Sequence, residues 1–596
     1  MGNRRTDIDI LKGLAISLVI LYHMKVLRYG YLGVDIFFVI SGFLSVPGIV
    51  GAVGDGSFRY SSFIWHKVQR LLPLLLLVSA FSLLAGYAGM LPDDYENLAE
   101  SVVATLSFSN NILADITTRS YWDVSNDYKP LIHTWYVGVL FEFYLLLPLV
   151  VMAVKKVTGK FRLRFEKTVA VTLALLAVLS LFLYLLPGIK SSDRFFLLHC
   201  RFFELAAGAL AGMRIVSRRA AVFRGSSGGV VFLLLVSVLC QCWRPLPLNV
   251  LLLLVVALTT LCFLFDNKRS RVFSVHAAAK VPAAFGVMSY SLYVCHQPLL
   301  AFLGYFRFYD PSLLSGTLTL LLIIFVSCAS YYFIERGRLT SILRKPVLIT
   351  ATLIVAGASA AIAMHGGVVR DVPELDIRMD DAHVKMHAEY VDRIYSYDKD
   401  FPAANGRINV LAVGNSFTRD WCNVLLESVM ADSINLSYVE FLDTADMRRV
   451  RQADYIFFYG YRRGLPRWLW DDIAPQAEVW GIGTKNFGKS NGRIYRNRHR
   501  ADYYSQTVRV VEDYLEENRR MAAEWKDRYI DMIAVVSAGD NEVRVFTDDR
   551  KFISQDTKHL TRSGARFYAA HIEFNRIFKR KRRTADNVGN CSQMEK

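Results

Sequence analysis

Ser416, Asp556 and His559 have the residue types of a nucleophile, an orienting carboxylate and a general base. Ser416 follows the apolar run 408–414 (INVLAVG), where a strand-to-helix turn would expose its hydroxyl. The amides of a helix N-terminus can stabilise a developing oxyanion at such a turn. Asp556 and His559 are three residues apart, so one short loop can present both toward a serine. A serine after a strand is usually only a helix N-cap, but with the Asp-x-x-His element present we favour catalysis.

A second candidate site lies in the first apolar run, which carries Lys12 near its start and His23 near its end. Ionisable groups inside a membrane segment are costly and tend to mark a site or a pathway. Eleven positions correspond to about three helical turns, so the two side chains share nearly one face, roughly 16 Å apart. A long anionic cofactor could lie along the line from the cation to the deeper imidazole.

The spacing of Lys12 and His23, followed by the run 33–44 (GVDIFFVISGFL), resembles the start of the acyltransferase-3 family of integral membrane proteins. In that family the membrane part carries an acyl group, commonly acetyl, from cytoplasmic acyl-CoA to an acceptor outside. The resemblance implies that His23 is the catalytic residue and that acetyl-CoA is the donor. We expect no metal cofactor.

The segment 63–73 (FIWHKVQRLLP) resembles a basic stretch that enters the third helix in the same family. With Lys12, it would supply the cations that hold the CoA phosphates, since fixed cations suit phosphate oxygens; they are His66, Lys67 and Arg70. An alternative of equal weight is that they are ordinary cytoplasmic anchors of a membrane helix.

Three further segments resemble family segments: 133–148, 201–210 and 289–300. The first departs from the pattern, because Leu140 and Phe141 stand where an acidic pair is usual. It offers Glu142 instead, one residue or about 100° of helix rotation away, which leaves the role of that acid open. Arg201 and Glu204 are expected to pair with each other inside the membrane. His296 is either functional or part of such a pair.

The back of the chain resembles the SGNH hydrolase family, with GNSF (414–417) in place of the usual GDS block and DTKH (556–559) as the DxxH block. Gly460 and the stretch 483–486 (GTKN) follow the order of that family's oxyanion-hole blocks. The resemblance implies an oxyanion hole formed by Ser416, Gly460 and Asn486. Asn415 replaces the usual aspartate, which affects the expected fine geometry.

Apolar segments dominate before residue 365 of this 596-residue chain. Since about 20 apolar residues cross a bilayer, we predict about eleven spans; the run 98–114 is too polar to count and is expected at the surface. The net charge of +17 lies largely in short loops between spans, which favours a lipid bilayer over nucleic acid as partner. No CxxC pair supports a zinc site or a disulfide framework. The spans are 8–24, 33–51, 69–91, 131–154, 168–187, 199–215, 228–243, 247–265, 283–305, 315–335 and 347–364.

The basic loops alternate with loops poor in lysine and arginine, which predicts a cytoplasmic N-terminus and a C-terminal part outside the cytoplasm. We expect a polytopic α-helical membrane domain (1–365), an extracytoplasmic connector (366–406), an α/β three-layer, flavodoxin-like SGNH domain (407–578) and a charged, disordered tail (579–596). The back domain alternates strands with helices. Its expected strands are 408–414, 434–441, 454–460, 477–483 and 529–536, with a long helix over 505–525.

Together the two resemblances imply a bacterial inner-membrane O-acetyltransferase that modifies an extracytoplasmic glycan, such as lipopolysaccharide O-antigen, lipooligosaccharide or peptidoglycan. Two alternatives stay open. A membrane-tethered carbohydrate esterase would need only the back domain. A polytopic exporter with an accessory domain would depend on neither Ser416 nor acyl-CoA.

Overall fold

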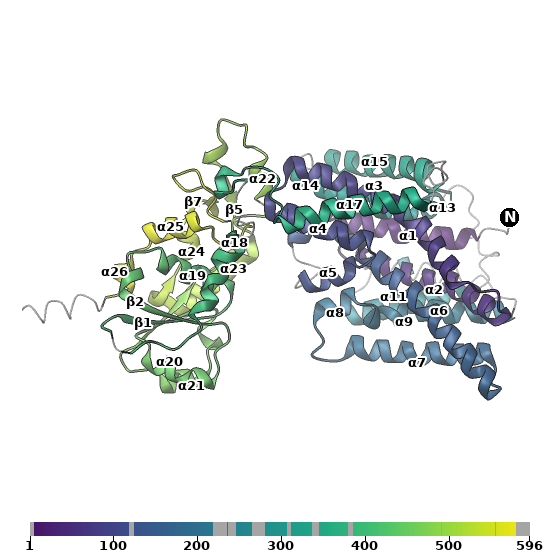
Figure 1. Ribbon diagram of the computed structural model, residues 1–596, viewed down its shortest axis with the longest axis horizontal. Helices are drawn as coiled ribbons and strands as arrows, with labels where there is room; N and C mark the ends of the chain where they lie inside the picture. Colours follow the sequence, from purple (N-terminus) through teal and green to yellow (C-terminus); the bar gives the residue numbers. More distant parts are fainter. Residues whose placement is uncertain are drawn as a thin grey trace, which may run out of the picture. The chain divides into compact units, whose positions relative to one another are not determined.

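The computed structural model describes residues 5–117, 124–218, 235–236, 246–264, 280–306, 312–336, 345–379, 386–403, 405–489, 491–554 and 556–579. The chain divides into two compact units, the first formed by residues 1–89 and 95–363 and the second by residues 90–94 and 364–596 (Figure 1). The first unit is helical and the second combines helices with a parallel sheet.

The described part of the first unit contains seven helical segments that are long and apolar enough to cross a membrane. They correspond, within two residues at the ends that extend past a helix, to the predicted spans 33–51, 69–91, 131–154, 168–187, 199–215, 315–335 and 347–364. The helices of this unit are α1 (Thr6–His23), α2 (Gly33–Asp55), α3 (Tyr60–Gly89), α4 (Pro92–Leu106), α5 (Asn110–Thr117), α6 (Trp135–Phe161), α7 (Phe165–Leu185), α8 (Ser191–Phe196), α9 (Leu198–Arg218), α11 (Leu248–Leu264), α13 (Lys280–Val287), α14 (Ser289–Tyr305), α15 (Leu313–Ser330), the π-helix η5 (Tyr331–Glu335) and α17 (Lys345–Met364).

Four of the eleven predicted spans differ from those seven segments. The first, 8–24, is helix α1, whose 18 residues contain two aspartates and one lysine. The span 247–265 is the 17-residue helix α11, and 283–305 is divided into α13 and α14. The span 228–243 lies outside the described residues, apart from 235–236.

The run 98–114 forms parts of α4 and α5 rather than a span, as expected from its polarity. The prediction that it lies at the surface is wrong for one of its faces, because Leu98, Val102 and Asn111 are buried. The polar positions of α4 and α5 are spaced so that an apolar stripe remains on each helix, which is the pattern of an amphipathic helix packed on one side.

Two pairs of helices in the first unit approach so closely that only glycine fits between them. Gly42 of α2 and Gly208 of α9 face each other's helix, and so do Gly13 of α1 and Gly286 of α13. A Cβ atom on any of the four would come within 1.7 to 1.9 Å of a backbone carbonyl oxygen of the other helix. Small residues at helix contacts are a feature of membrane bundles, where close packing rather than hydrophobic burial drives association.

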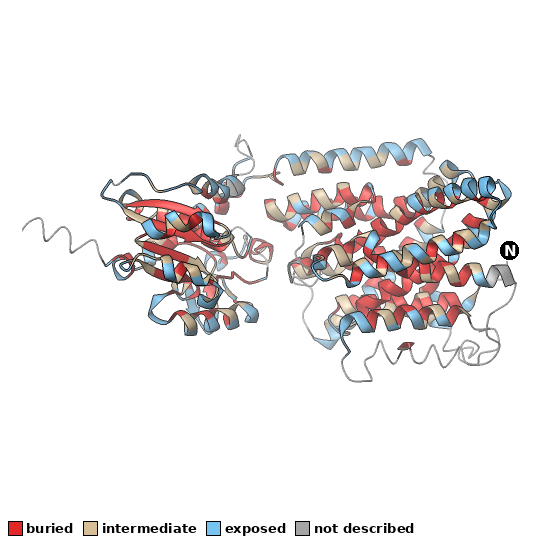
Figure 2. Ribbon diagram, turned by 90° about the horizontal axis from the view of Figure 1, so that it is seen from below, coloured by how far each residue is buried: buried red, intermediate tan, exposed pale blue. Residues whose placement is uncertain are grey.

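The outer helices α7, α15 and α17 expose most of their apolar side chains (Figure 2). Leu175, Phe325 and Leu353 are 66%, 71% and 67% exposed. Exposed apolar surface on this scale is unusual in a soluble protein, whereas in a lipid bilayer it is the favoured outer surface. The first unit is therefore a multi-pass membrane domain.

The second unit contains a five-stranded parallel sheet in the order β2-β1-β3-β4-β6 (Figure 1). Its strands are β1 (Ile408–Val413), β2 (Ile434–Val439), β3 (Tyr455–Tyr459), β4 (Glu478–Ile482) and β6 (Tyr529–Ile530). Successive side chains of a strand point to opposite faces, so Val410 and Ala412 join one core and Leu411 and Val413 join another.

Helices cover both faces of this sheet and give three layers. Helices α19 (Ser416–Leu426) and α25 (Arg562–His571) pack into the first core, while α20 (Met447–Gln452), α21 (Arg467–Asp472) and the end of α23 (Glu512–Trp525) pack into the second. The remaining helices of the unit are α18 (Met386–Asp392), α22 (Gly492–Tyr495), α24 (Met532–Val535) and α26 (Phe574–Ile577). The strand order is that of flavodoxin-like folds.

All five predicted strands begin within one residue of their predicted positions, but two predictions in this unit are wrong. The segment 505–525 is helical only from Glu512, because residues 507–509 form β5 of a second, antiparallel sheet with β8 (Glu542–Arg544) and β7 (Ser537–Gly539). The predicted strand 529–536 ends after Ile530, because the Asp531 side chain accepts hydrogen bonds from the Ile533 and Ala534 amides and caps helix α24.

Candidate active sites

Ser416, His559 and Asp556 form a hydrogen-bonded triad in the second unit. The Oγ atom of Ser416 lies 2.9 Å from Nε2 of His559, and Nδ1 of His559 lies 2.6 Å from Oδ2 of Asp556. A carboxylate only accepts hydrogen bonds, so Nδ1 carries the proton and Nε2 has the lone pair that can take the serine proton. The side chains of His559 and Asp556 are 27% and 36% exposed, so the triad is open to a substrate.

The turn that holds Ser416 is built by the two residues before it. Gly414 has φ +129°, in the left-handed region, and a Cβ there would meet Oγ1 of Thr418 at 2.7 Å. The Asn415 side chain accepts a hydrogen bond from the Phe417 amide and caps helix α19, which leaves Ser416 as its first residue. Asn415, which departs from the SGNH pattern, thus serves as the N-cap.

The strand order also accounts for the place of this triad. Ligands of open α/β sheets bind at the carboxyl ends of the strands, where the strand order reverses. Here that point lies between β1, which ends at Val413, and β3, which ends at Tyr459. Ser416 follows the first of these strands and Gly460 follows the second.

Asp556 and His559 stabilise each other's charged forms. Burial alone would lower the pKa of His559, but the negative charge and the hydrogen bond of Asp556 outweigh it and raise that pKa. Burial would raise the pKa of Asp556, but His559 and the amides of Lys558 and His559, both 2.8 Å from Oδ1, hold it well below its usual range. The carboxylate therefore stays ionised while His559 titrates.

The two residues expected to complete the oxyanion hole beside Ser416 both make hydrogen bonds with neighbouring groups. They are Gly460 and Asn486. The carbonyl of Gly460 accepts a hydrogen bond from Nε1 of Trp525, and its φ of +139° lies in the region that favours glycine. Oδ1 of Asn486 accepts from the amides of Gly488 and Val511, and its Nδ2 donates to the Gly488 carbonyl. The NH₂ group of Asn486 has a second N–H, which this bond does not use and which an oxyanion would need. The oxyanion role of Asn486 stays a prediction.

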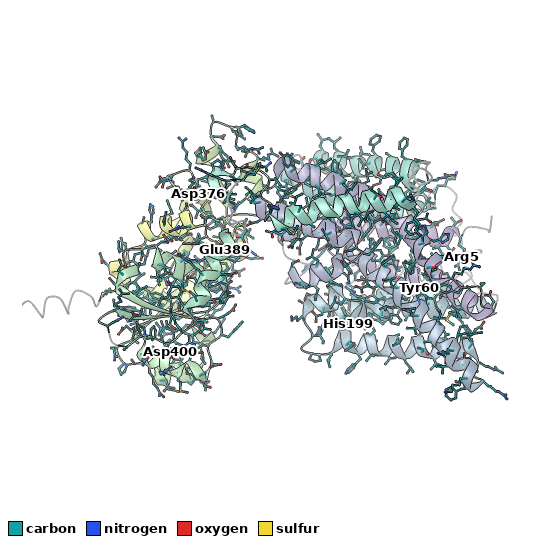
Figure 3. All side chains as sticks on the ribbon, viewed as in Figure 1. Arg5, Tyr60, His199, Asp376, Glu389 and Asp400 are labelled. Carbon is teal, nitrogen blue, oxygen red and sulfur yellow. The ribbon has the colours of Figure 1, made fainter. Side chains whose placement is uncertain are left out.

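In the first unit, the four residues predicted to bind acyl-CoA line one cavity of about 650 Å³. Lys12 of α1 and His66, Lys67 and Arg70 of α3 share it with side chains of α2, α6 and α14. This volume is in the range of small-molecule and cofactor sites. Figure 3 shows the side chains of this unit and marks Tyr60, with which α3 begins.

The walls of the cavity combine cations with phenol and hydroxyl groups from the family-like segments 33–44 and 133–148. Nζ of Lys67 lies 3.9 Å from the centre of the Tyr144 ring. Tyr136 and Ser41 also line the cavity, with their hydroxyls 3.3 Å apart. Such a cavity suits a long anionic ligand with polar and apolar parts.

His23, at the end of α1, makes a hydrogen bond to another histidine. Its Nδ1 lies 2.9 Å from the Val19 carbonyl and 3.3 Å from Nε2 of His296. Nδ1 of His296 lies 2.7 Å from the Tyr293 carbonyl, so it must donate there, and Nε2 of His296 is left as an acceptor. His23 thus carries its proton on Nδ1 and keeps the lone pair on Nε2, the atom that would act as a base. His296 is fully buried, whereas His23 is only partly buried.

Tyr293 connects the cavity to this pair of histidines. Its side chain lines the cavity, and its hydroxyl donates to the His133 carbonyl at 2.6 Å. The ring centres of Tyr293 and His296 are 5.7 Å apart, and those of His133 and His296 are 5.2 Å apart. The cavity wall is therefore one aromatic ring away from His296.

Arg201, Glu142 and Glu335 of the membrane domain each interact with neighbouring polar side chains. Nη1 of Arg201 lies 2.9 Å from both Asp35 and Glu204, which confirms the expected pairing and adds Asp35 to it. Glu142 accepts a hydrogen bond from Nδ2 of Asn111 at 2.8 Å. Glu335, the last residue of the π-helix η5, accepts a hydrogen bond from Ser291 at 2.8 Å and interacts electrostatically with Arg70 and Lys12.

Within the described residues, no group of three or more His, Cys, Asp and Glu side chains is arranged to hold a metal ion.

A multi-pass helical domain with a cation-lined cavity beside a histidine, joined to an α/β unit with a serine triad, defines a membrane-bound enzyme of group transfer.

Comparison with known proteins gives the family. The acyltransferase-3 model, described as an acyltransferase domain, matches residues 5–335, and the chain belongs to this family of acyltransferases. BcsY of Komagataeibacter xylinus, named as a membrane-bound transacylase, is 27% identical over 390 residues, which cover 62% of this chain and 93% of BcsY. OatA of Listeria monocytogenes, named as a peptidoglycan O-acetyltransferase, is 25% identical over 311 residues, 49% of each chain. No solved structure matches the chain.

Proposed function

We propose that this protein is an O-acetyltransferase that moves acetyl from cytoplasmic acetyl-CoA to a hydroxyl of an extracytoplasmic glycan. One observation carries the proposal: a chain that belongs to an acyltransferase family has a hydrogen-bonded Ser416–His559–Asp556 triad in its second unit. That triad is the constellation of serine acyl-transfer enzymes, which are recognised by geometry and roles. The SGNH resemblance of the motifs supports the same role.

In the membrane domain, the cavity would hold acyl-CoA, with its phosphates near Lys12, His66, Lys67 and Arg70. His23 would act as the base, since the bond between its Nδ1 and His296 leaves Nε2 to accept a proton. The acceptor attacks the thioester carbon, its proton passes to His23, the C–S bond breaks, and CoA leaves as a thiol after regaining a proton. His296 would orient His23, in the way that a carboxylate orients the base of a serine triad.

In the second unit, His559 takes the proton of Ser416 as the Ser416 oxygen attacks the acyl carbon. The acyl–oxygen bond to Ser416 forms, the bond to the acyl donor breaks, and the leaving group takes the proton back from His559. A sugar hydroxyl then gives its proton to His559 and attacks the acyl-Ser416 ester, which transfers the acyl group and restores the serine. Backbone amides at the start of α19, with Gly460 and Asn486, would stabilise the oxyanion.

The proposed location is the bacterial inner membrane, with the N-terminus in the cytoplasm and the second unit outside. The charge of the loops supports this orientation. It places the donor cavity's cations on the acyl-CoA side and the triad on the glycan side. The name of OatA supports peptidoglycan as one acceptor class; lipopolysaccharide and lipooligosaccharide are the others.

The test is mass analysis of surface glycans from cells that carry the gene with single substitutions. Ser416→Ala and His23→Ala should each abolish O-acetylation, while Ser505→Ala and His571→Ala, at exposed positions, should retain it. Lys12→Ala should raise the acetyl-CoA concentration needed for half-maximal transfer. Lys25→Ala, two residues after the end of the same helix and outside the cavity lining, should not.

The two alternatives give different results in this experiment. If His23→Ala retains normal function while Ser416→Ala fails and glycans gain acetyl groups, the protein is an esterase. If neither substitution changes the glycans and purified protein does not use acetyl-CoA, the exporter alternative holds.

A further inference from the structure

Asp420 and Lys485 form an ion pair in the interior of the second unit. Nζ of Lys485 lies 2.7 Å from Oδ2 of Asp420, and the two residues are 1% and 0% exposed. Burying a charge costs several kcal/mol even after the protein relaxes, and replacing such a pair by apolar residues is often neutral or stabilising. The pair is therefore poorly explained by stability alone, and its surroundings indicate a role.

The pair joins three segments, which carry Ser416, Asn486 and the Asp556–His559 loop. Asp420 is on α19, one helical turn after Ser416. Lys485 directly precedes Asn486, and its Nζ lies 3.9 Å from the centre of the Phe417 ring. The amide of Leu560, the residue after His559, donates to Oδ2 of Asp420 at 3.2 Å.

We propose that the Asp420–Lys485 pair positions the triad: it fixes the His559 segment against the start of α19 and balances the electrostatic potential at the His559 imidazole. This inference rests on the proposed role of Ser416 as nucleophile. Asp420 and Lys485 act through His559 and Ser416 rather than on the substrate, so they are positioning residues.

Asp420 and Lys485 change the pKa of His559 in opposite directions. The charged groups that act on His559 are Asp556, which is hydrogen-bonded to it, and then Asp420 and Lys485. Asp420 raises the pKa of His559 and Lys485 lowers it, so the two charges of the intact pair oppose each other at the imidazole. Burial lowers the pKa of Lys485 itself, and Asp420 and Asp556 oppose that change.

The substitution Lys485→Met leaves Asp420 without its counter-charge, and Asp420 still accepts the Leu560 amide. The pKa of His559 then rises, so more of the imidazole is protonated at a given pH and less can accept the serine proton. The acidic limb of the rate profile must move to higher pH. In Lys485→Met/Asp420→Asn both charges are gone, and the limb should move back from the position of Lys485→Met toward lower pH.

The experiment measures the rate at which a fluorophosphonate labels the detergent-purified full chain between pH 5 and 9. Ser416→Ala gives the background, so a natural protein that labels no faster than Ser416→Ala refutes the proposed function itself. With Ser416-dependent labelling present, Lys485→Met should label on the order of 10- to 100-fold more slowly, with its acidic limb at higher pH. Lys485→Arg, which keeps the charge, should keep the limb of the natural protein.

A role in structure alone would lower the rates without moving the limb. The inference is therefore refuted if the limb of Lys485→Met coincides with that of the natural protein, or if the double variant keeps the shift of the single one. Gel filtration shows whether each variant is folded. If Lys485→Met aggregates, Lys485→Gln replaces it, with the same expected shift and the same refuting results.

Discussion

Replacing Asp556 by asparagine tests the triad more sharply than removing it. In the natural protein, Oδ1 of Asp556 accepts the amides of Lys558 and His559, each at 2.8 Å, and Oδ2 accepts Nδ1–H of His559 at 2.6 Å. The asparagine oxygen can keep the two amides only if its NH₂ group faces Nδ1. A donor then faces a donor, and the imidazole must move its proton to Nε2, where it points at Ser416 and can no longer accept the serine proton.

The structure therefore predicts that Asp556→Asn loses more activity than Asp556→Ala. The wrong tautomer should reduce acyl-enzyme formation on the order of 10³- to 10⁴-fold. In Asp556→Ala, water can reach Nδ1 because the Asp556 side chain is 36% exposed, and the tautomer stays free, so the loss should be about 10²-fold. Both losses should be smaller than that of Ser416→Ala.

Removing Asp556 should shift the pH dependence of the reaction in a direction that the structure predicts. Asp556 raises the pKa of His559, so its removal lowers that pKa and neutral imidazole persists to lower pH. The acidic limb of the Asp556→Ala profile should move to lower pH, opposite to the shift expected for Lys485→Met. The assay is the burst of p-nitrophenol from p-nitrophenyl acetate by the full chain, with mass analysis of the acyl-Ser416 peptide. The tautomer argument would be refuted by equal losses of activity in Asp556→Asn and Asp556→Ala. It would also be refuted if the acidic limb of Asp556→Ala moved to higher pH.

Three further predictions concern the membrane domain. A phosphatase reporter fused after residue 590 should be active and one fused at residue 160 inactive; the reverse result would contradict the proposed orientation. Arg201→Met leaves Asp35 and Glu204 buried without their shared cation and should cost about 3–5 kcal/mol of stability, seen as loss of monodisperse protein in detergent, which Arg28→Met should not cause. His296→Phe keeps the ring but not the bond to His23 and should slow acetyl transfer about 10- to 100-fold; unchanged transfer would mean that His296 only fills space.

The features predicted correctly are those that the sequence encodes over short distances. The strand before Ser416 and the capped start of the helix after it are encoded within about ten consecutive residues. The Asp-x-x-His spacing places both of its side chains in one loop. The pairing of Arg201 with Glu204 is also local, because positions three apart share a helix face. In each case geometry along the chain, rather than packing, decides the contact.

The contacts that were missed depend on packing between distant segments. Lys485 and Asp420 are 65 residues apart, and His296 and His23 are 273 residues apart. The first contact depends on how the loop after β4 packs against α19, and the second on how α1 packs against α14, and no periodicity in the sequence indicates either packing. Strand β5 was predicted as helix because its three residues are too few to show an alternating pattern. The early end of β6 does have a signal in the sequence, since Asp531, which directly follows it, is a residue type preferred at a helix N-cap.

The glycine contacts of the membrane domain have a consequence for how an acyl group would cross the bilayer. With Gly13 against α13 and Gly286 against α1, neither helix can slide along the other unless their backbones first separate. The same holds for α2 and α9 at Gly42 and Gly208. Transporters that rock one half of the bundle against the other need surfaces that slide or part. In the proposed mechanism α1 keeps its position against α13, so donor and acceptor would both come to His23, and the acyl group would pass between them by exchange of bonds at that imidazole.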